Sequence, residues 1–397
     1  MNFFQLTFDR SPAGRKFTRA ARRLLLGIAL ALAIVASGCR VDRKLDHPSE
    51  NLQKVECNVS SHYVDNLCED EVQYLKWAED LKEYPRLSDL NREVLYGITQ
   101  GTKDVDKAAA VFYTRVLREP KNKQFYEYLI GKEKELIKAT PDYSDLNVLL
   151  ALVPGAFYED NTSIGADGAK LRELVVKMGL KEDLIRVEQT GSVYRNAEII
   201  CDYLKNRNDV DGIILASVSK GSSDIKMALQ KCGDQPYFKK VVGWYNIGGI
   251  NKGSVLVNAL NDDWVNKWEA RTYFCLNGYD WEGVQTMRAD KGSPLDFELQ
   301  LPEQILLINV VGVPTFRFVT NRARPYYEYL IRYGPNDGVS LLSDTYMPGG
   351  ITWVSWRNDH YFTWPISEQK MQAFVVYIIE NRRAELRELK KNAAAVQ

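Results

Sequence analysis

Apolar runs alternate with helix-compatible segments from residue 147 to the C-terminus of this 397-residue chain. Within a run most positions are apolar or small, as in residues 210–218 (VDGIILASV), instead of every second one. Strands of that kind are buried on both faces, which indicates a mostly parallel sheet with helices on each side. We therefore predict an α/β fold. Its strands are expected at residues 147–153, 184–187, 210–218, 240–245, 304–313 and 351–356, and its helices at residues 166–178, 196–206, 222–231 and from a cap at Ser367 to about residue 391.

The predicted strand at residues 210–218 ends in a serine among small residues, in the string SVSKG (residues 217–221). A strand that turns sharply into a helix at such a serine leaves its Oγ exposed, and glycine permits the strained backbone of the turn. The string departs from GxSxG only at Ser217, which is small enough for the turn. Ser219 is therefore the candidate nucleophile, and the side chain of Lys220 is expected at the surface.

A nucleophilic serine needs a base, and the chain has three histidines, His47, His62 and His360. The first two precede every predicted strand, so His360 is the one that follows the serine. One interpretation is that His360 is a packed aromatic side chain next to Tyr361. The upstream serine and acid favour the other interpretation, in which His360 takes the proton of Ser219.

Two carboxylates compete to orient the ring of His360. Asp337 lies in an Asn-Asp-Gly string at a strand end, where a loop carboxylate can turn toward an imidazole. Asp344 follows in LLSDTY. Because Asn-Asp-Gly also occurs as a simple hairpin turn, that interpretation stays open. We predict Asp337 as the acid and keep Asp344 in reserve.

The order of these residues resembles that of the bacterial triacylglycerol lipases and related esterases of the α/β-hydrolase superfamily. Their nucleophile often sits in GHSKGG, their acid in NDG, and their histidine about two dozen residues later; here 23 residues separate Asp337 from His360. Two more strings are similar to theirs. LVPGAF at residues 152–157 resembles the VHGF-type loop, and GINKGS at residues 249–254 resembles SPHRGS.

The resemblance covers roughly residues 147–362 and implies an α/β-hydrolase fold with Ser219, Asp337 and His360 as its catalytic residues. It also implies an oxyanion hole made by the backbone N–H groups of Ala156 and Lys220. These groups would stabilise the negative oxygen that forms when a serine attacks an acyl carbonyl.

The chain departs from the family pattern at several positions. Pro154 stands where the related loop has a histidine, and Ser217 and Ser222 replace two glycines of the turn. Residues 261–302 have no counterpart that can be aligned. Their aromatic side chains form either a lid over the site or a surface that packs the segment onto the body.

The N-terminus has the parts of a secretory signal peptide. Six Lys or Arg side chains precede an apolar run at residues 24–35 that is short for a membrane span and ends in Ala-Ser-Gly-Cys. That cysteine, Cys39, resembles the acylated first mature residue of bacterial lipoproteins; the alternative is ordinary cleavage near a cysteine. We expect residues 1–38 to be removed and the protein to be lipid-anchored in the bacterial cell envelope. The same resemblance implies the outer over the inner membrane, if the cell is Gram-negative, because Arg40 and not an aspartate follows the cysteine.

Removal of the leader would leave 46 basic and 51 acidic side chains, because residues 1–38 hold six basic residues and one acid. This slight excess of acidic side chains does not favour binding to nucleic acid. In an oxidising compartment Cys57 and Cys68 are expected to form a disulfide, and Cys201 and Cys232 would pair if their helices pack side by side. No CxxC or His-rich spacing is present, so neither a metal nor another cofactor is expected.

Residues 39–68 are polar and aperiodic, as expected of a tether between a lipid and a domain. Residues 69–143 carry apolar side chains at helical spacing, interrupted by Pro and Gly, which predicts a helical accessory region. Its aromatic side chains are expected to pack against the body, the alternative being a partner-binding face. The α/β-hydrolase domain then occupies residues 144–397.

These features predict a membrane-anchored serine hydrolase that cleaves carboxylic esters, as an esterase or lipase does. The substrate would be an acyl ester, either a small molecule or a lipid. The acyl chains on Cys39 would attach the protein to the membrane. The altered turn favours an alternative, a binding lipoprotein with a catalytically idle hydrolase fold. A transacylase acting on envelope lipids or glycans would use the same three side chains.

Overall fold

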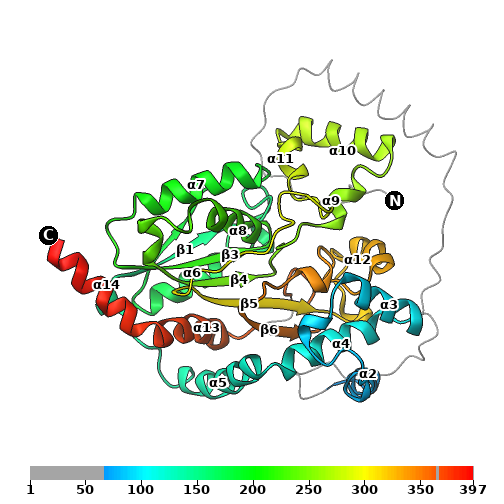
Figure 1. Ribbon diagram of the computed structural model, residues 1–397, viewed down its shortest axis with the longest axis horizontal. Helices are drawn as coiled ribbons and strands as arrows, with labels where there is room; N and C mark the ends of the chain where they lie inside the picture. Colours follow the sequence, from blue (N-terminus) through cyan, green and yellow to red (C-terminus); the bar gives the residue numbers. More distant parts are fainter. Residues whose placement is uncertain (1–66, 364–365, 397) are drawn as a thin grey trace. The chain divides into compact units, whose positions relative to one another are not determined.

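The computed structural model describes residues 67–363 and 366–396 (Figure 1). A six-stranded sheet lies at its centre, and every neighbouring pair of strands is parallel. The strand order β2-β1-β3-β4-β5-β6 places β3 and β4 in the middle of the sheet. The strands are β1 (Val148–Val153), β2 (Lys181–Leu184), β3 (Gly212–Val218), β4 (Val241–Ile247), β5 (Leu306–Val313) and β6 (Ile351–Trp356).

Helices cover both faces of the sheet (Figure 1). One face carries α7 (Val193–Lys205) and α8 (Lys220–Cys232), and the other carries α5 (Pro120–Leu136), α6 (Ala169–Lys177), α13 (Glu368–Asn381) and α14 (Arg383–Val396). Successive strand residues alternate between the two cores: Leu149 packs in the first, and Leu150 in the second. Burial on both sides explains why the strands are continuous apolar runs, and the predicted parallel α/β sheet is confirmed.

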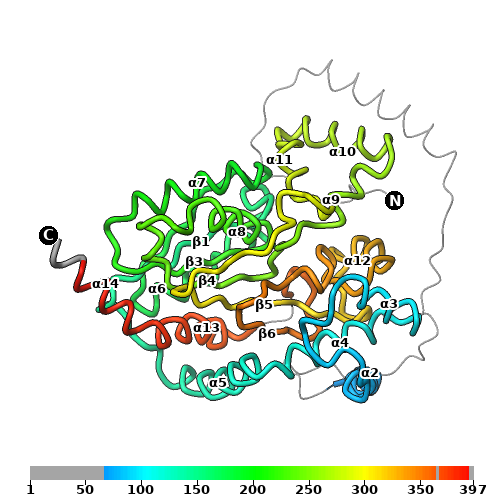
Figure 2. Tube along the Cα trace, viewed as in Figure 1, coloured from blue at the N-terminus to red at the C-terminus, as the bar shows by residue number. Residues whose placement is uncertain are grey.

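The helical region packs on the β6 edge of the sheet. Figure 2 shows its blue and cyan trace beside the orange segment around β6. Tyr113 meets the ring of Trp356 at 4.9 Å between centroids, and Phe112 meets Tyr346 at 6.0 Å, so its aromatic side chains do face the body. In this region α5 is preceded by α2 (Glu69–Asp80), α3 (Arg92–Thr102) and α4 (Val105–Arg118).

Most predicted elements differ from the structure only by up to three residues at their ends, but two differ more. The second strand is Lys181–Leu184, not residues 184–187, because an edge strand is half exposed and tolerates the polar string KED that an apolar pattern overlooks. The predicted final helix is two helices, α13 and α14, which meet at Arg382. Leu386 of α14 turns back onto the sheet core, and neither glycine nor proline marks the break.

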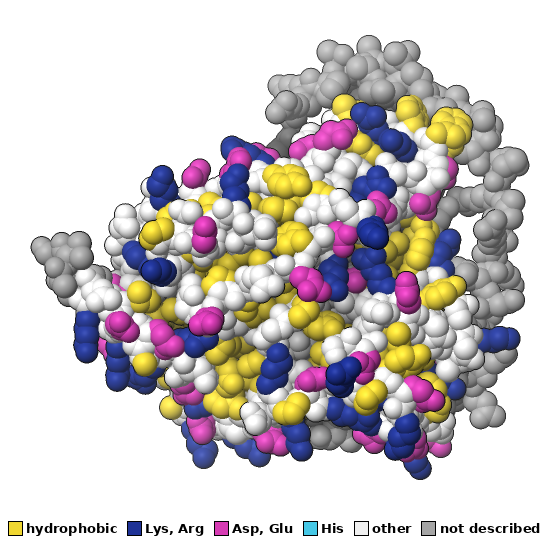
Figure 3. Space-filling model, in the orientation of Figure 1, with side chains coloured by type: hydrophobic (Ala, Val, Ile, Leu, Met, Phe, Trp, Pro, Cys, Tyr) yellow, Lys and Arg dark blue, Asp and Glu magenta, His cyan; other side chains and the backbone are white. Residues whose placement is uncertain are grey.

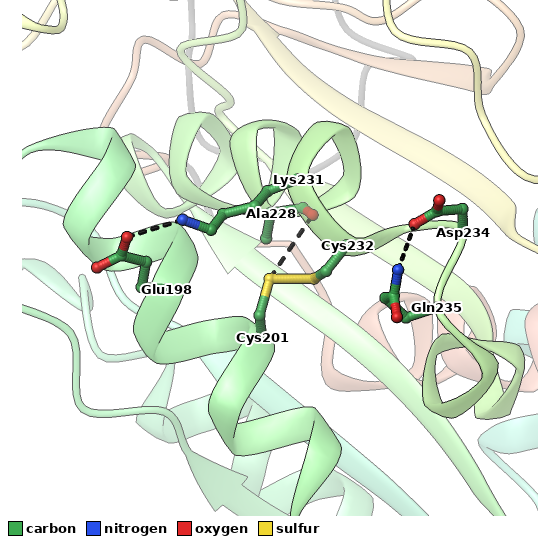
Figure 4. The surroundings of a disulfide bond; sticks show 7 residues. All are labelled: Glu198, Cys201, Ala228, Lys231, Cys232, Asp234 and Gln235. Atoms are coloured by element: carbon green, nitrogen blue, oxygen red, sulfur yellow. Dashed lines mark hydrogen bonds and ion pairs between the residues drawn. A yellow bond between two sulfur atoms is a disulfide. The ribbon is translucent and has the colours of Figure 1, made fainter.

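A disulfide joins the helices on either side of β3. Cys201 of α7 and Cys232 of α8 are bonded, with a Cα–Cα distance of 6.2 Å (Figure 4). The two helices do pack side by side, as the pairing required. Cys39 and Cys57 lie outside the described residues, so the lipidation site and the Cys57–Cys68 bond stay predictions.

The remaining helices lie in the connections. They are α9 (Val255–Ala259), α10 (Trp264–Asn277), α11 (Trp281–Gln285) and α12 (Arg324–Leu330), together with the short 3-10 helices η2 (Leu87–Asp89), η3 (Ser144–Leu146), η4 (Thr162–Ile164), η5 (Pro236–Lys240), η6 (Phe316–Phe318), η7 (Ile331–Tyr333) and η8 (Leu342–Asp344).

Among the described residues, no helix combines the length and apolar character needed to cross a membrane. Acidic and basic side chains are interspersed over the face drawn in Figure 3.

Candidate active site

Ser219 occupies a sharp turn between β3 and α8. Its φ of 52° and ψ of −117° are a strained conformation for a residue with a side chain. The turn also needs Gly221, because a Cβ there would lie 2.3 Å from the carbonyl oxygen of Val153. The small side chains of the string SVSKG therefore let the helix start directly against β1, with Ser219 at the carboxyl edge of the sheet.

The structure brings Ser219, His360 and Asp337 together. His360 Nε2 is 2.9 Å from the Oγ of Ser219, and His360 Nδ1 is 2.9 Å from an Oδ2 of Asp337. In the tautomer whose Nδ1–H donates to the carboxylate, Nε2 is left to accept from the serine hydroxyl. The ring is therefore oriented to take a proton from Ser219.

The turn around Asp337 fixes its carboxylate. Asp337 Oδ1 accepts from the backbone N–H groups of Val339 at 2.8 Å and Ser340 at 2.7 Å, which leaves Oδ2 for the imidazole. The backbone N–H of His360 also donates to the carbonyl of Asp337 at 2.8 Å. Gly338, with φ 95°, completes a turn closed by an isolated antiparallel bridge between Asn336 and Leu341. No strands flank this turn in the part of the chain that the structure describes, so it is not a β-hairpin, and its carboxylate faces the histidine.

The reserve acid, Asp344, binds other side chains, and it is Asp337 that contacts His360. Its Oδ2 accepts from Arg92 of α3 at 2.8 Å, and its Oδ1 accepts from the hydroxyl of Ser343. Burial raises the pKa of this carboxyl, and the charge of Arg92 opposes that rise. Asp344 therefore belongs to the junction between the helical region and the loop before β6.

The two predicted oxyanion donors are the backbone N–H groups of Ala156, which follows Gly155, and of Lys220, which follows Ser219. Within the described residues, neither Ala156 N–H nor Lys220 N–H has a hydrogen-bond acceptor. The loop before Ala156 passes close to the nucleophile, because a Cβ added to Gly155 would lie 3.3 Å from the Cβ of Ser219. Lys220 is also the first residue of α8, where the helix dipole favours negative charge. Both N–H groups therefore lack a partner within the part of the chain that the structure describes, and their role as an oxyanion hole stays a prediction.

The side chain of Lys220 is buried, and the expectation that it lies at the surface is wrong. It is 3% exposed, and its Nζ donates to both oxygens of Asp224 at 2.9 Å. Asn196 of α7 donates to the same carboxylate at 2.9 Å. Burial raises the pKa of Asp224, although the ammonium of Lys220 opposes the rise. A carboxylate four positions along the helix can keep the lysine buried. The charge of Lys220, taken alone, had suggested a surface position.

A buried polar network lies beneath the turn, and it explains the two serines that replace glycines. The hydroxyl of Ser217 accepts from the indole N–H of Trp244 at 2.8 Å, and the hydroxyl of Ser222 donates to Asn246 Oδ1 at 2.5 Å. Asn246 in turn donates to Asn309 Oδ1 at 3.0 Å. Sequence reasoning missed this network, whose only signal was an asparagine in each of two apolar strands.

The segment at residues 261–302 packs onto the oxyanion loop through aromatic rings. Phe157, the residue after Ala156, lies 5.0 Å from Tyr279 and 6.4 Å from Phe274 between ring centroids. Phe274 is 5% exposed, whereas Trp264 of α10 is 80% exposed. Part of the aromatic set therefore anchors the segment, and its role as a lid stays a prediction.

A parallel sheet in this strand order, a sharp strand-to-helix turn at a serine, and an acid and a histidine that follow in that order define an α/β-hydrolase fold. The described residues contain no group of three or more His, Cys, Asp or Glu side chains arranged to hold a metal ion.

Several solved structures are similar to this chain. The metagenomic carboxyl esterase MGS0156 is 19% identical, with a TM-score of 0.49 over 60% of this chain and 78% of that chain. The lipase BlEst2 of Bacillus licheniformis in mature form is 16% identical, with a TM-score of 0.42 over 62% and 94%. The carboxylesterase CesB of Bacillus subtilis is 11% identical, with a TM-score of 0.30 over 65% and 98%. No protein-family model and no curated protein matches the chain.

Proposed function

We propose that this protein is a serine hydrolase that cleaves carboxylic esters. One observation carries the proposal: Ser219 sits in a strained turn and is linked by two 2.9 Å contacts through His360 to Asp337. A serine hydroxyl is a weak nucleophile until a base takes its proton, and the chain supplies that base and the acid that orients it.

In the first half of the reaction, Ser219 Oγ attacks the ester carbonyl while its proton passes to His360 Nε2. Asp337 stabilises the imidazolium that forms. The carbonyl oxygen becomes negative, and the backbone N–H groups of Ala156 and Lys220 donate to it. His360 Nε2 then gives the proton to the leaving alkoxide, the carbon–oxygen bond of the ester breaks, and the acyl group remains on Ser219.

In the second half, water replaces the alcohol. His360 Nε2 takes a proton from the water as its oxygen attacks the acyl carbonyl, and the same two N–H groups bind the oxyanion. The proton then returns to Ser219 Oγ as its bond to the acyl carbon breaks. The products are a carboxylic acid and the free enzyme, so no co-reactant other than water is required.

Hydrolysis of p-nitrophenyl esters tests this proposal. We expect turnover by the purified protein, and a fall of about a thousandfold or more in kcat for Ser219→Ala, because loss of the nucleophile leaves only binding and the oxyanion hole. Ser163→Ala, which removes an exposed hydroxyl of η4, is the matched control and should keep wild-type turnover. A series of chain lengths from acetate upward would identify the preferred acyl group.

Two outcomes would count against esterase activity. Unchanged hydrolysis in Ser219→Ala would assign the reaction to another group. A folded wild-type protein that hydrolyses none of the esters would favour a catalytically idle binding protein.

We also propose that the enzyme is carried as a lipoprotein in the bacterial cell envelope. The support is the leader sequence alone: a basic segment, an apolar run and Ala-Ser-Gly before Cys39. Acyl chains on Cys39 would tether the catalytic domain to a membrane, since each buried methylene contributes about 0.8 kcal/mol. Metabolic labelling with a fatty acid should mark the wild-type protein and not Cys39→Ser; equal labelling of both would contradict the anchor.

A further inference from the structure

A buried ion pair joins the helical region to the loop that carries His360. Glu71 of α2 is 1% exposed, and Arg357, the residue after β6, is 5% exposed. Arg357 donates from Nε to Glu71 Oε1 at 2.8 Å and from a terminal guanidinium nitrogen to Oε2 at 2.5 Å. The Glu71 carboxylate also accepts from the indole N–H of Trp356 and the backbone N–H of Cys68, both at 2.7 Å. Such a bidentate contact allows very little change in geometry.

The backbone of Arg357 is strained. Its φ of 70° lies in the left-handed region, which residues with a side chain rarely adopt. A conformation of this kind persists only where the surroundings hold it. The backbone N–H of Arg357 donates to the carbonyl of Val313 at 2.9 Å, and the carboxylate of Glu71 holds its side chain. His360 follows three residues later, so the direction in which the chain leaves β6 sets the start of its loop.

The other end of the loop is held by a second carboxylate. Asp359 Oδ2 accepts from the backbone N–H of Thr320 at 2.8 Å and from its hydroxyl at 2.6 Å. A Cβ on Gly312 of β5 would lie 2.7 Å from the carbonyl oxygens of Asn358 and Asp359, so this segment passes directly against the sheet. Of the two carboxylates, only Glu71 comes from the helical region.

We propose that Glu71 is a positioning residue: through Arg357 it fixes the loop that sets His360 against Ser219. The inference rests on the proposed hydrolase function and extends it, because it makes α2 part of the apparatus that orients the base. Neither Glu71 nor Arg357 touches the substrate. Their effect is on the distance and angle between His360 Nε2 and Ser219 Oγ, which govern proton transfer.

Steady-state kinetics of Glu71→Gln and Arg357→Lys in the full chain test the role. Gln keeps the shape and one acceptor oxygen but loses the charge, and Lys keeps the charge but loses the planar fork. We expect kcat to fall by about tenfold to a hundredfold in both, as for a displaced catalytic group, with KM within about twofold of wild type. The low-field proton resonance of His360 Nδ1–H should also shift or broaden in both variants.

Arg172→Lys is the matched control. Arg172 of α6 makes two hydrogen bonds to the carboxylate of Glu182 of β2, and β2 lies at the edge of the sheet opposite β6. The pair matches Glu71 and Arg357 in chemistry but belongs to neither α2 nor the His360 loop. Arg172→Lys should leave kcat and the low-field resonance as in wild type, and an equal loss of kcat there would overturn the inference by showing a general effect of weakening an ion pair.

The remaining outcomes are also decisive. Wild-type kcat in both Glu71→Gln and Arg357→Lys, with activity lost in Ser219→Ala, would overturn the positioning role and keep the hydrolase. Loss of soluble protein in both variants would identify the pair as structural and overturn it as well. Activity that persists in Ser219→Ala would instead reject the hydrolase mechanism itself.

Discussion

Asn246 connects the nucleophile turn to the sheet at the scale of single residues. This side chain of β4 is fully buried, and it exchanges hydrogen bonds with Ser222, Asn251 and Asn309. Buried polar groups of this kind stabilise only when every partner is satisfied, and they specify one arrangement of the strands that carry them. The serines of the turn therefore act as anchors for the backbone that presents Ser219.

Asn246→Ala should remove this anchor. At least two buried polar groups would lose a partner, and each costs about 1–3 kcal/mol, so we expect the free energy of unfolding to fall by about 2–6 kcal/mol. Urea denaturation measures the change. Asn381→Ala, at an exposed asparagine that donates to the carbonyl of Tyr377, should change it by less than about 0.5 kcal/mol. A fall as small as the control's would show that the network does not stabilise the fold.

At the scale of elements, α7 and α8 are the pair that supports the nucleophile strand. They lie on one face, share a core with β1 and β3, and are cross-linked by Cys201 and Cys232 across 31 residues. Lys220 and Asp224 tie the start of α8 to Asn196 of α7 by side chains as well. The helix that begins at the proposed oxyanion donor is therefore held at both ends.

Cys201→Ala with Cys232→Ala should destabilise the protein by about 3–4 kcal/mol, because the unfolded chain regains the freedom that closing a loop of this length removes. Chemical denaturation of the oxidised wild type and the double variant measures the difference. Cys275, a free and exposed cysteine among the described residues, is the control, and Cys275→Ala should have little effect. A loss below about 1 kcal/mol would contradict the stabilising role of the bond.

At the scale of the whole molecule, the helical region and the sheet share buried surface and buried titratable groups. Asp106 of α4 is 3% exposed and accepts from the backbone N–H of Phe316 at 2.8 Å, in the connection after β5. Burial, followed by the charges of Asp104 and Asp70, raises the pKa of Asp106 to about 8. We therefore expect the stability of this junction to depend on pH.

The sign of this effect follows from proton binding. Between about pH 4 and pH 8 the folded protein holds a proton on Asp106 that the unfolded chain has lost, so this group's contribution to the free energy of unfolding falls as pH rises. Asp106→Asn keeps an acceptor for Phe316 but cannot ionise. From pH 5 to pH 8 the wild type should lose at least about 1.4 kcal/mol more stability than the variant, the equivalent of one pKa unit. Parallel losses in urea denaturation would contradict the raised pKa.

The sequence predicted those elements and site residues whose signal lies in neighbouring residues. The apolar run at residues 351–356 matches β6 to the residue, because a strand buried on both faces leaves that signature. The break at Arg382 left none: Leu386, just beyond it, packs in the sheet core, and no local pattern marks that contact. Residue types and their order were enough to propose Ser219, Asp337 and His360, because few histidines compete for the role.

Contacts between distant residues could not be predicted in this way. Glu71 and Arg357 are 286 positions apart, and nothing in either local string indicates that one holds the other. Lys220 pairs with Asp224, four residues further along α8, so the two partners are close in the sequence. Only packing, however, decides whether such a pair faces solvent or the core. The residues that support the site were therefore harder to predict than those that form it.

The most direct measurement is the mass of the protein after reaction with a fluorophosphonate. An activated serine displaces fluoride and forms a phosphonate ester, so we predict one adduct per chain, located on Ser219 by peptide mapping. His360→Ala and Asp337→Asn should slow its formation, since the hydroxyl loses its base or the base loses its orientation. An adduct on another serine, or no adduct on folded wild-type protein, would contradict the assignment of Ser219 as the nucleophile.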